Sequence, residues 1–72
     1  MYGEDRIYKK VEIIGVSRTS IQAAIETAVT KARASLDKLS WFEVKDIRGH
    51  IGEDGNVAEY QVVVKVAFLL KG

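Results

Sequence analysis

The sequence predicts an α+β protein built as a single domain over residues 1–72, with its elements in the order strand, helix, strand, strand. Apolar residues recur at three- and four-residue steps through residues 21–39, as they do along one side of an amphipathic helix. Runs rich in β-branched residues lie on both sides of this stretch and are typical of strands. With one helix, only one face of the resulting sheet can be covered.

The first strand is expected over residues 7–16, in "IYKKVEIIGV", which ends near a glycine and the polar "SRTS". Ser17 or Thr19 is expected to cap the N-terminus of the following helix. Gln22, three residues after Thr19, would complete a capping box. The apolar stripe of this helix consists of Ile21, Ala24, Ile25, Ala28, Ala32, Leu36 and Leu39.

Two more strands are expected in the second half of the chain, "WFEVKDIRGHI" and "VAEYQVVVKVAFLL", joined by the turn "GEDGN". Asp54-Gly55 is typical of a two-residue hairpin turn, because both residues tolerate positive φ. Counting outward from this pair places Arg48 directly opposite Gln61. The apolar residues of the second strand change parity midway, which predicts a bulge near residues 45 and 46.

The last strand has one apolar parity, which should face the helix: Tyr60, Val62, Val64, Val66, Phe68 and Leu70. Its opposite parity is half apolar, whereas a sheet with one wet face should alternate more cleanly. A chain of 72 residues has only a small core of its own. We therefore expect other subunits to bury the three apolar members of that parity, Val63, Ala67 and Leu69.

The charges are balanced, with eleven Lys and Arg against ten Asp and Glu, and neither sign forms a block. This balance argues against duplex nucleic acid or an anionic membrane as a partner. No apolar run approaches the roughly 20 residues of a membrane span, and the N-terminus lacks the hydrophobic region of a signal peptide. The chain has no cysteine, which excludes disulfides and thiolate metal sites. We expect a cytoplasmic protein.

Catalytic and metal-binding chemistry has little support in the sequence. His50, the single histidine, has neither the partners of a catalytic triad nor a second histidine with which to share a metal. The glycines lack the spacing of a phosphate-binding loop, and "GEDGN" is too short for an EF-hand. The paired aromatic signature of small RNA-binding sheet domains is absent from the sequence. We expect no enzymatic activity, no metal and no nucleic-acid partner.

Trp41, the single tryptophan, falls between the predicted helix and the second strand. Such a residue either fills a core or a subunit interface, or offers its indole as a stacking platform for a planar ligand. A platform needs polar groups nearby, and the amide of Gln61 carries both a donor and an acceptor. With Arg48 opposite it, Gln61 would form a polar cluster suited to a flat, oxygen-rich or anionic ligand. The residues alone leave both interpretations open.

Four segments together resemble the bacterial type of the dodecin family over residues 8–70: "YKKVEIIGVS", "AAIETAVTKARASL", "WFEVKDIRGHI" and "YQVVVKVAFLL". The "WFEV-x-x-IRG" block is the most specific part of this likeness. The resemblance implies a β-α-β-β subunit in which a three-stranded antiparallel sheet wraps around one helix. It also implies a hollow homododecamer that binds flavins without catalysis, stores or sequesters them and protects against their photochemistry. Bacterial members favour FMN, archaeal members favour riboflavin, and some members bind coenzyme A.

The roles of individual residues also follow from the resemblance. Trp41 matches the tryptophan that stacks on the isoalloxazine ring, where flavins lie in pairs between symmetry-related tryptophans. Gln61 matches the glutamine that forms hydrogen bonds with the polar end of the ring, and Arg48 matches the arginine that lines the same site. Ser40 stands where a backbone contact to the flavin is usual. The expected flavin-binding residues are therefore these four, with FMN or riboflavin as the ligand.

The chain departs from the family where a phosphate group would be held. Bacterial dodecins commonly carry "GFRL" in the last strand, whereas this chain has "AFLL", so Leu69 replaces an arginine. A charge-assisted contact to the phosphate of FMN or coenzyme A is then missing. Arg6, Lys9 and Lys31 are the candidates to supply that charge instead. Two alternatives remain: a structural oligomeric cage with weak or no ligand binding, motivated by Leu69, and a flavoenzyme, for which the sequence offers no acid, base or nucleophile.

Overall fold

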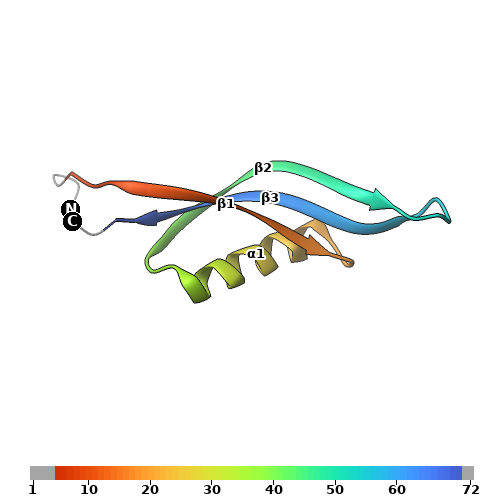
Figure 1. The fold of residues 1–72 in the computed structure, drawn as a ribbon, viewed down its shortest axis with the longest axis horizontal. Helices are drawn as coiled ribbons and strands as arrows, with labels where there is room; N and C mark the ends of the chain where they lie inside the picture. The colour runs from red at the N-terminus through yellow and green to blue at the C-terminus, as the bar shows by residue number, and fades with distance from the viewer. Residues whose placement is uncertain (1–4, 71–72) are drawn as a thin grey trace.

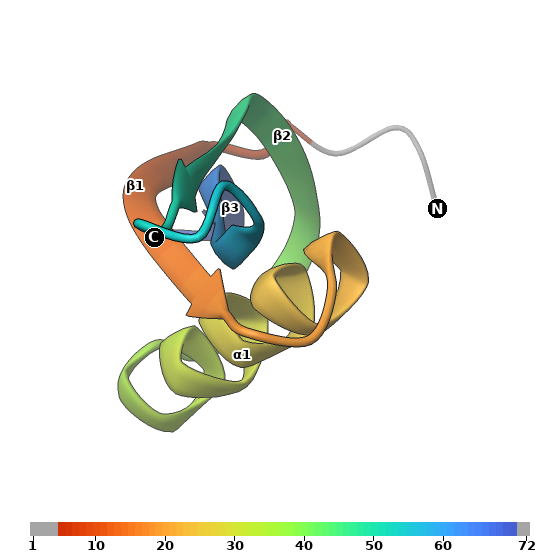
Figure 2. The same ribbon diagram turned by 90° about the vertical axis from the view of Figure 1, so that its right-hand side faces the viewer.

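The computed structural model of the protein describes residues 5–70. Its elements are β1 (Tyr8–Ser17), α1 (Ile21–Ser35), β2 (Leu39–Ile51) and β3 (Val57–Leu69), and the strands form one antiparallel sheet in the order β1-β3-β2 (Figure 1). Seen end-on, the sheet curves and α1 lies across its concave side (Figure 2). The predicted fold class is confirmed. Within residues 5–70, no helix is both long and apolar enough to cross a membrane.

Ser20 caps the N-terminus of α1, so the prediction of Ser17 or Thr19 was wrong. The Ser20 hydroxyl accepts a hydrogen bond from the backbone N–H of Ala23 at 2.9 Å. The Ser17 hydroxyl instead accepts the N–H of Thr19 at 3.0 Å, within the turn that precedes the helix. The capping box does not form either, because the Gln22 amide donates to a carboxylate one turn further along the helix. All three hydroxyl residues suit a cap, and the Ser17 turn decides which of them takes it.

The helix ends at Ser35, earlier than the apolar stripe in the sequence suggests. Leu36 is the C-cap residue with an extended backbone, and Leu39 already begins β2. Both leucines still pack against the core from outside the helix. Lys38 has a φ of 58° in the short turn between α1 and β2, the left-handed conformation that reverses the chain direction.

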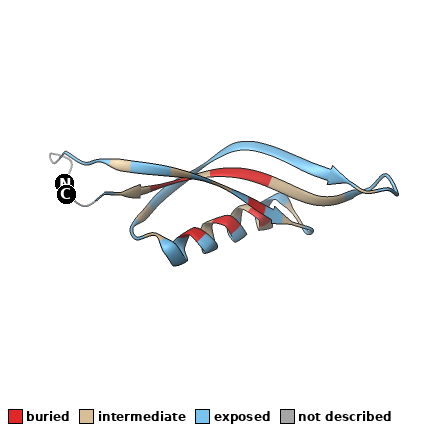
Figure 3. Ribbon diagram, viewed as in Figure 1, coloured by how far each residue is buried: buried red, intermediate tan, exposed pale blue. Residues whose placement is uncertain are grey.

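The core lies where α1 meets the middle of the sheet (Figure 3). Three alanines of the helix and three valines of β3 are buried together: Ala24, Ala28, Ala32, Val62, Val64 and Val66. Small side chains on the helix allow it to approach the strands closely, which compensates for the short contact surface. The predicted helix-facing parity of β3 is therefore confirmed at its centre, whereas Leu70 beyond the end of β3 is exposed.

The face of the sheet turned away from α1, which we call the outer face, does not need other subunits to cover its central valine and alanine. Val63 is 5% exposed and Ala67 is fully buried within the single chain. The expectation that partners bury them was wrong, because β3 lies between β1 and β2. Side chains from both neighbours close over it, such as Lys10 and Trp41 on either side of Ala67. Leu69, nearer the end, is only partly buried.

The uncovered apolar surface lies on β2 instead. This strand is the edge on the side that α1 scarcely reaches, since the helix packs mainly on β1 and β3 (Figure 3). Phe42, Val44 and Ile47 pair with the buried valines of β3 and share their face, yet each is exposed by more than two fifths. An open apolar groove of ≈ 1290 Å³ also runs between β1 and α1. Surface of this extent is typical of subunit contacts.

The hairpin between β2 and β3 extends beyond α1 (Figure 1) and closes differently from the predicted two-residue turn. The N–H of Gly55 donates to the carbonyl of Gly52 at 3.0 Å, and Gly55 has a φ of 84°. The N–H of Gly52 donates to the carbonyl of Asn56 at 2.9 Å. The connection is therefore a turn of three residues between Gly52 and Asn56, with the glycine in its left-handed position.

Three irregularities interrupt the pairing of β2 with β3. The shift between Val44 and Asp46 leaves Lys45 as the extra residue and confirms the predicted bulge. A second shift, between Leu39 and Trp41, isolates Ser40 and was not predicted. The third lies next to the hairpin and offsets the longer turn, so that Arg48 still pairs with Gln61 as expected.

Candidate functional site

Trp41 lies inside β2 and not at its junction with the helix. It follows the bulge at Ser40 and pairs with Ala67, whose parity belongs to the outer face. The residue is 44% exposed, so the indole neither fills the core nor stands free. The bulge turns this part of the edge strand and the small side chain of Ala67 leaves room above β3.

An aromatic and cationic group surrounds one side of the indole. The ring of Tyr8, which lies across β3 on β1, has its centroid 4.8 Å from that of Trp41 at an interplanar angle of 57°. The guanidinium of Arg6 lies 5.9 Å from the centroid of the Tyr8 ring, within the range of a cation–π contact. The tilted arrangement of two aromatic rings is a favourable one. Tyr8 thus supports the indole from the side of β1.

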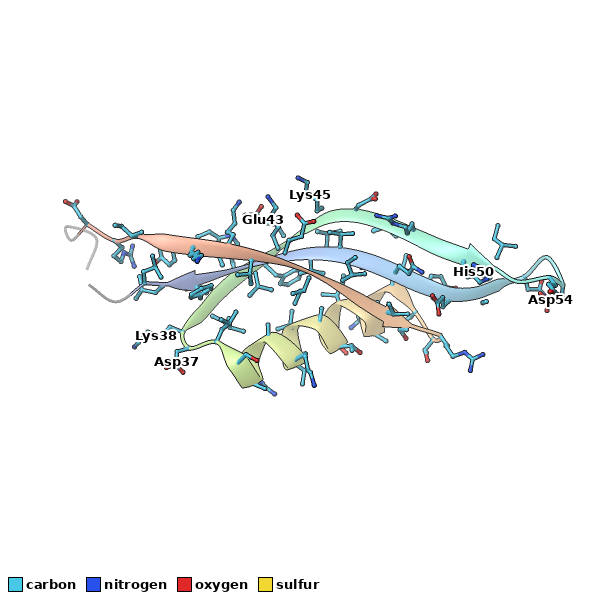
Figure 4. All side chains as sticks on the ribbon, in the orientation of Figure 1. Asp37, Lys38, Glu43, Lys45, His50 and Asp54 are labelled. Carbon is cyan, nitrogen blue, oxygen red and sulfur yellow. The ribbon has the colours of Figure 1, made fainter. Side chains whose placement is uncertain are left out.

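Glu43 fixes the polar edge of the indole. The Nε1–H of Trp41 donates to Oε2 of Glu43 at 2.9 Å, and Nζ of Lys10 lies 3.1 Å from each oxygen of the same carboxylate. Figure 4 shows Glu43 on the side of the sheet away from α1. The hydrogen bond from Trp41, followed by that from Lys10, lowers the pKa of Glu43 below its ordinary value. The carboxylate form is therefore favoured by its neighbours.

Arg48 and Gln61 form a second polar group on the outer face, nearer the hairpin. They are cross-strand partners, as the sequence predicted. The amide Nε2 of Gln61 donates to Oε2 of Glu59 at 2.8 Å, and an Arg48 nitrogen lies 3.5 Å from Oδ2 of Asp46. The Arg48 side chain remains more than half exposed. Both groups can therefore turn to an incoming ligand at low cost.

The two groups do not meet within one chain. Trp41 pairs with Ala67 and Arg48 pairs with Gln61, and the six residue steps of strand from Gln61 to Ala67 span roughly 20 Å. A single planar ring system cannot touch the indole and the amide of the same chain at once. A ligand that uses both must take them from different copies.

The remaining predicted site residues divide between the faces. Ser40 lies beside Trp41, and its hydroxyl donates to the carbonyl of Lys38 at 3.3 Å. Of the three cations proposed for phosphate, Arg6 lies next to the aromatic group through its contact with Tyr8. Lys9 pairs with Phe68, whose parity faces α1, and Lys31 is a residue of the groove between β1 and α1. Only Arg6 is therefore brought near Trp41.

Tyr8, Lys10 and Glu43 contribute to the site but were not predicted from the sequence. A signal for the carboxylate was present, because residues two apart on a strand share a face and Glu43 follows Trp41 at that spacing. The contacts from β1 could not be predicted without the strand order, which places β1 and β2 on either side of β3. Within residues 5–70, the structure holds no cluster of three or more histidine, aspartate or glutamate side chains that could bind a metal.

A β-α-β-β chain with an exposed tryptophan on the outer face of a curved three-stranded sheet defines a class of small binding proteins with apolar surfaces left for assembly. The chain belongs to the dodecin family, whose sequence profile matches residues 7–71. A dodecin from Thermus thermophilus is 54% identical over 66 residues, which cover 92% of this chain and 94% of that protein.

Solved structures agree with this assignment. A crystal structure of a Thermus thermophilus protein has a TM-score of 0.88 at 53% identity and covers 94% of this chain and 98% of its own. A calcium dodecin from Mycobacterium tuberculosis, described as having a novel calcium-binding site, has a TM-score of 0.78 at 31% identity and covers 90% and 91%. The likeness therefore extends over nearly the whole chain in both sequence and fold.

Proposed function

We propose that this protein is a non-enzymatic flavoprotein that binds FMN or riboflavin between copies of its chain and stores the flavin within a hollow homododecamer in the cytoplasm. The observation that carries the proposal is the Trp41 indole. It is partly exposed on the outer face, braced by Tyr8 and held at its N–H by Glu43. An aromatic ring fixed in this way is preorganised to stack on another flat ring.

The polar part of the ligand is assigned to Arg48 and Gln61 of a different copy. Their distance from Trp41 on one chain supports a site that forms only on assembly. The amide of Gln61 offers a donor and an acceptor to the edge of the isoalloxazine ring, and the guanidinium of Arg48 offers donors to its oxygens. The backbone at the Ser40 bulge, beside Trp41, completes the site.

Assembly into a shell is supported by the apolar surface that one chain leaves uncovered. This surface includes the helix-side residues of β2 and two grooves along α1, one of which is lined by Phe42. In an assembly, other copies of the chain would cover this apolar surface. Stacking of a flavin on an indole also deactivates its excited state, so storage and photoprotection go together.

The chain offers fewer contacts to a phosphate group of the ligand than to its ring. Leu69 lies on β3 opposite Tyr8, next to the aromatic group, and offers no charge there. Of the three candidate cations, Arg6 alone contacts the aromatic group, through the ring of Tyr8. We therefore propose that FMN and riboflavin bind with similar affinity. Coenzyme A would bind weakly, with Arg6 as the contact to its phosphate. Leu69 also favours one second candidate, a structural cage that binds flavin weakly or not at all.

Extraction of the ligand from the purified native protein and its identification by mass spectrometry test the proposal directly. The purified protein should absorb in the flavin bands, and light scattering after size exclusion should give a mass far above the 8.0 kDa of one chain. An assembled protein that neither retains nor rebinds flavin would favour the structural cage. Turnover with NAD(P)H would instead indicate a flavoenzyme.

A further inference from the structure

We propose that Glu43, paired with Lys10, sets the orientation of the Trp41 indole, so that a flavin stacks most tightly while Glu43 is ionised. This role deepens the proposed function and rests on it. Glu43 is a positioning residue here, because it touches the indole and not the flavin. With this role of Glu43, flavin binding depends on pH in the acidic range.

The geometry gives the indole few ways to turn. Its Nε1–H is directed at a carboxylate two residues along the same strand and on the same face, at 2.9 Å. On the side of β1, the centroid of the Tyr8 ring lies 4.8 Å from that of the indole. Without the acceptor, the indole can rotate about its side-chain torsions while it remains attached to an exposed edge strand. The contact with Glu43 therefore selects one orientation out of several.

Lys10 keeps the acceptor in place. Its Nζ lies 3.1 Å from both oxygens of Glu43. The carboxylate therefore accepts hydrogen bonds from Lys10 on β1 and from the indole on β2. This chain of contacts crosses the sheet above Ala67, which pairs with both Lys10 and Trp41. A charge-assisted hydrogen bond is stronger than a neutral one, so the contact weakens when the carboxyl group gains a proton.

The charged groups around Glu43 support its ionised form. On the outer face, Lys65 of β3 pairs with Glu43 on one side and with Glu12 of β1 on the other. Lys10 approaches from β1, and Lys45 follows on β2, where Figure 4 shows it on the same side as Glu43. Two further carboxylates lie on this face: Glu12, and Asp46 beyond the bulge, which pairs with Val63 and forms an ion pair with Arg48. Lys10 and Lys65 nevertheless favour the negative charge of Glu43. Glu12 is the matched control because it makes no contact with the indole.

The direction of the pH effect follows from the lowered pKa of Glu43. Above that pKa the carboxylate is ionised and the indole is held. As the pH falls through it, the carboxyl group gains a proton and its hold on the indole weakens. Since the pKa lies below the ordinary value of a glutamate, the loss should occur in the acidic range and not near neutrality.

The test uses the single tryptophan as its own reporter. In the intact ¹⁵N-labelled protein without added ligand, the one indole N–H signal should titrate with a midpoint below the ordinary range of a glutamate. Glu43→Gln should abolish this titration, Glu12→Gln should leave it unchanged, and Lys10→Met should move the midpoint to higher pH. An indole signal that does not titrate, or that titrates equally in Glu43→Gln, overturns the assignment.

Riboflavin is the probe for binding, because it carries no phosphate group that would titrate in the same range. At neutral pH, Glu43→Leu should lower the affinity for riboflavin by roughly three- to tenfold, which is the effect of losing one hydrogen bond. Glu43→Gln keeps an acceptor, so it should recover part of the affinity and remove its dependence on acidic pH. Wild-type affinity in Glu43→Leu overturns the inference. If the wild type binds neither riboflavin nor FMN, the proposed function fails, whereas a titrating indole signal would still support the contact with Glu43.

Discussion

Gly15 on β1 lies against the carbonyl oxygen of Ala24 on α1, with no space for a side chain between them. A Cβ atom at Gly15 would overlap that oxygen and would lie 3.0 Å from the Cβ of Ala28. The obstacle is backbone, which cannot move aside as a flexible side chain can. The helix therefore rests on the sheet at a glycine.

The substitution Gly15→Ala should consequently lower the free energy of unfolding by about 3 kcal/mol or more, since an overpacked contact forces helix and strand apart. Chemical denaturation followed by circular dichroism measures the change. Gly52→Ala is the control, because a Cβ at Gly52 is crowded only by a side-chain oxygen of Asp54 at 3.2 Å, while its other neighbours lie at an ordinary 3.8 Å. Equal effects of the two substitutions would show that α1 can shift without cost.

The N-cap of α1 offers a second comparison between neighbouring residues. Ser20→Ala removes the hydroxyl that accepts the N–H of Ala23, and it should cost about 1 kcal/mol of stability. Thr19→Ala should cost much less, because its side chain forms no cap. Thermal unfolding of the two variants decides between them, and a larger loss in Thr19→Ala would contradict the observed cap.

Trp41→Ala should abolish most of the flavin affinity and leave the assembly intact. Stacking on an aromatic ring contributes on the order of 1–3 kcal/mol per ring in comparable systems. The fluorescence of bound flavin should be quenched by the wild type and recover in the variant. Light scattering serves as the control for assembly. A variant that binds nothing because it no longer assembles would show that Trp41 is an interface residue.

Leu69→Arg should widen the preference for FMN over riboflavin. The wild type is expected to favour FMN by less than about tenfold and with weak salt dependence, because one charged contact, worth roughly 1.5–3 kcal/mol, is missing. Arginine at this position would lie opposite Tyr8, beside the aromatic group. Leu69→Met is the control that keeps the volume without the charge. Titrations at two salt concentrations measure the effect.

A wild-type preference for FMN over riboflavin above a hundredfold, lost at high salt, would contradict this expectation. It would indicate that a different cation holds the phosphate, and Arg6 would be the first to test because of its place beside Tyr8. Arg6→Gln should then remove the preference while it leaves riboflavin affinity unchanged.

The sequence predicted the elements well because the hydrophobic periods of helix and strands are distinct. The pairing of Arg48 with Gln61 was also correct, although by two errors that offset each other. The turn is one residue longer than expected, and an irregularity beside His50 restores the register. Turn length and a neighbouring bulge are coupled in a hairpin, so the residues further along the strands can keep their partners.

Other features depend on information that no single segment contains. Val63 and Ala67 appeared to need other subunits, since the pattern of one strand does not reveal that β3 is central. The N-cap depended on a local competition between three hydroxyl residues. The support of Trp41 by Tyr8 and Lys10 crosses the whole sheet. Residues that lie far apart in the chain become neighbours only once the strand order is known.

The separation of Trp41 from Gln61 on one chain, roughly 20 Å along the sheet, makes ligand binding and self-association parts of one equilibrium. A flavin that needs residues from two copies adds its binding free energy to their association, so saturation with flavin should protect the assembly against dilution and heat. Conversely, the apparent affinity for flavin should fall once the protein is diluted below its own dissociation range. The cellular concentration of the protein would then decide how much flavin it can retain.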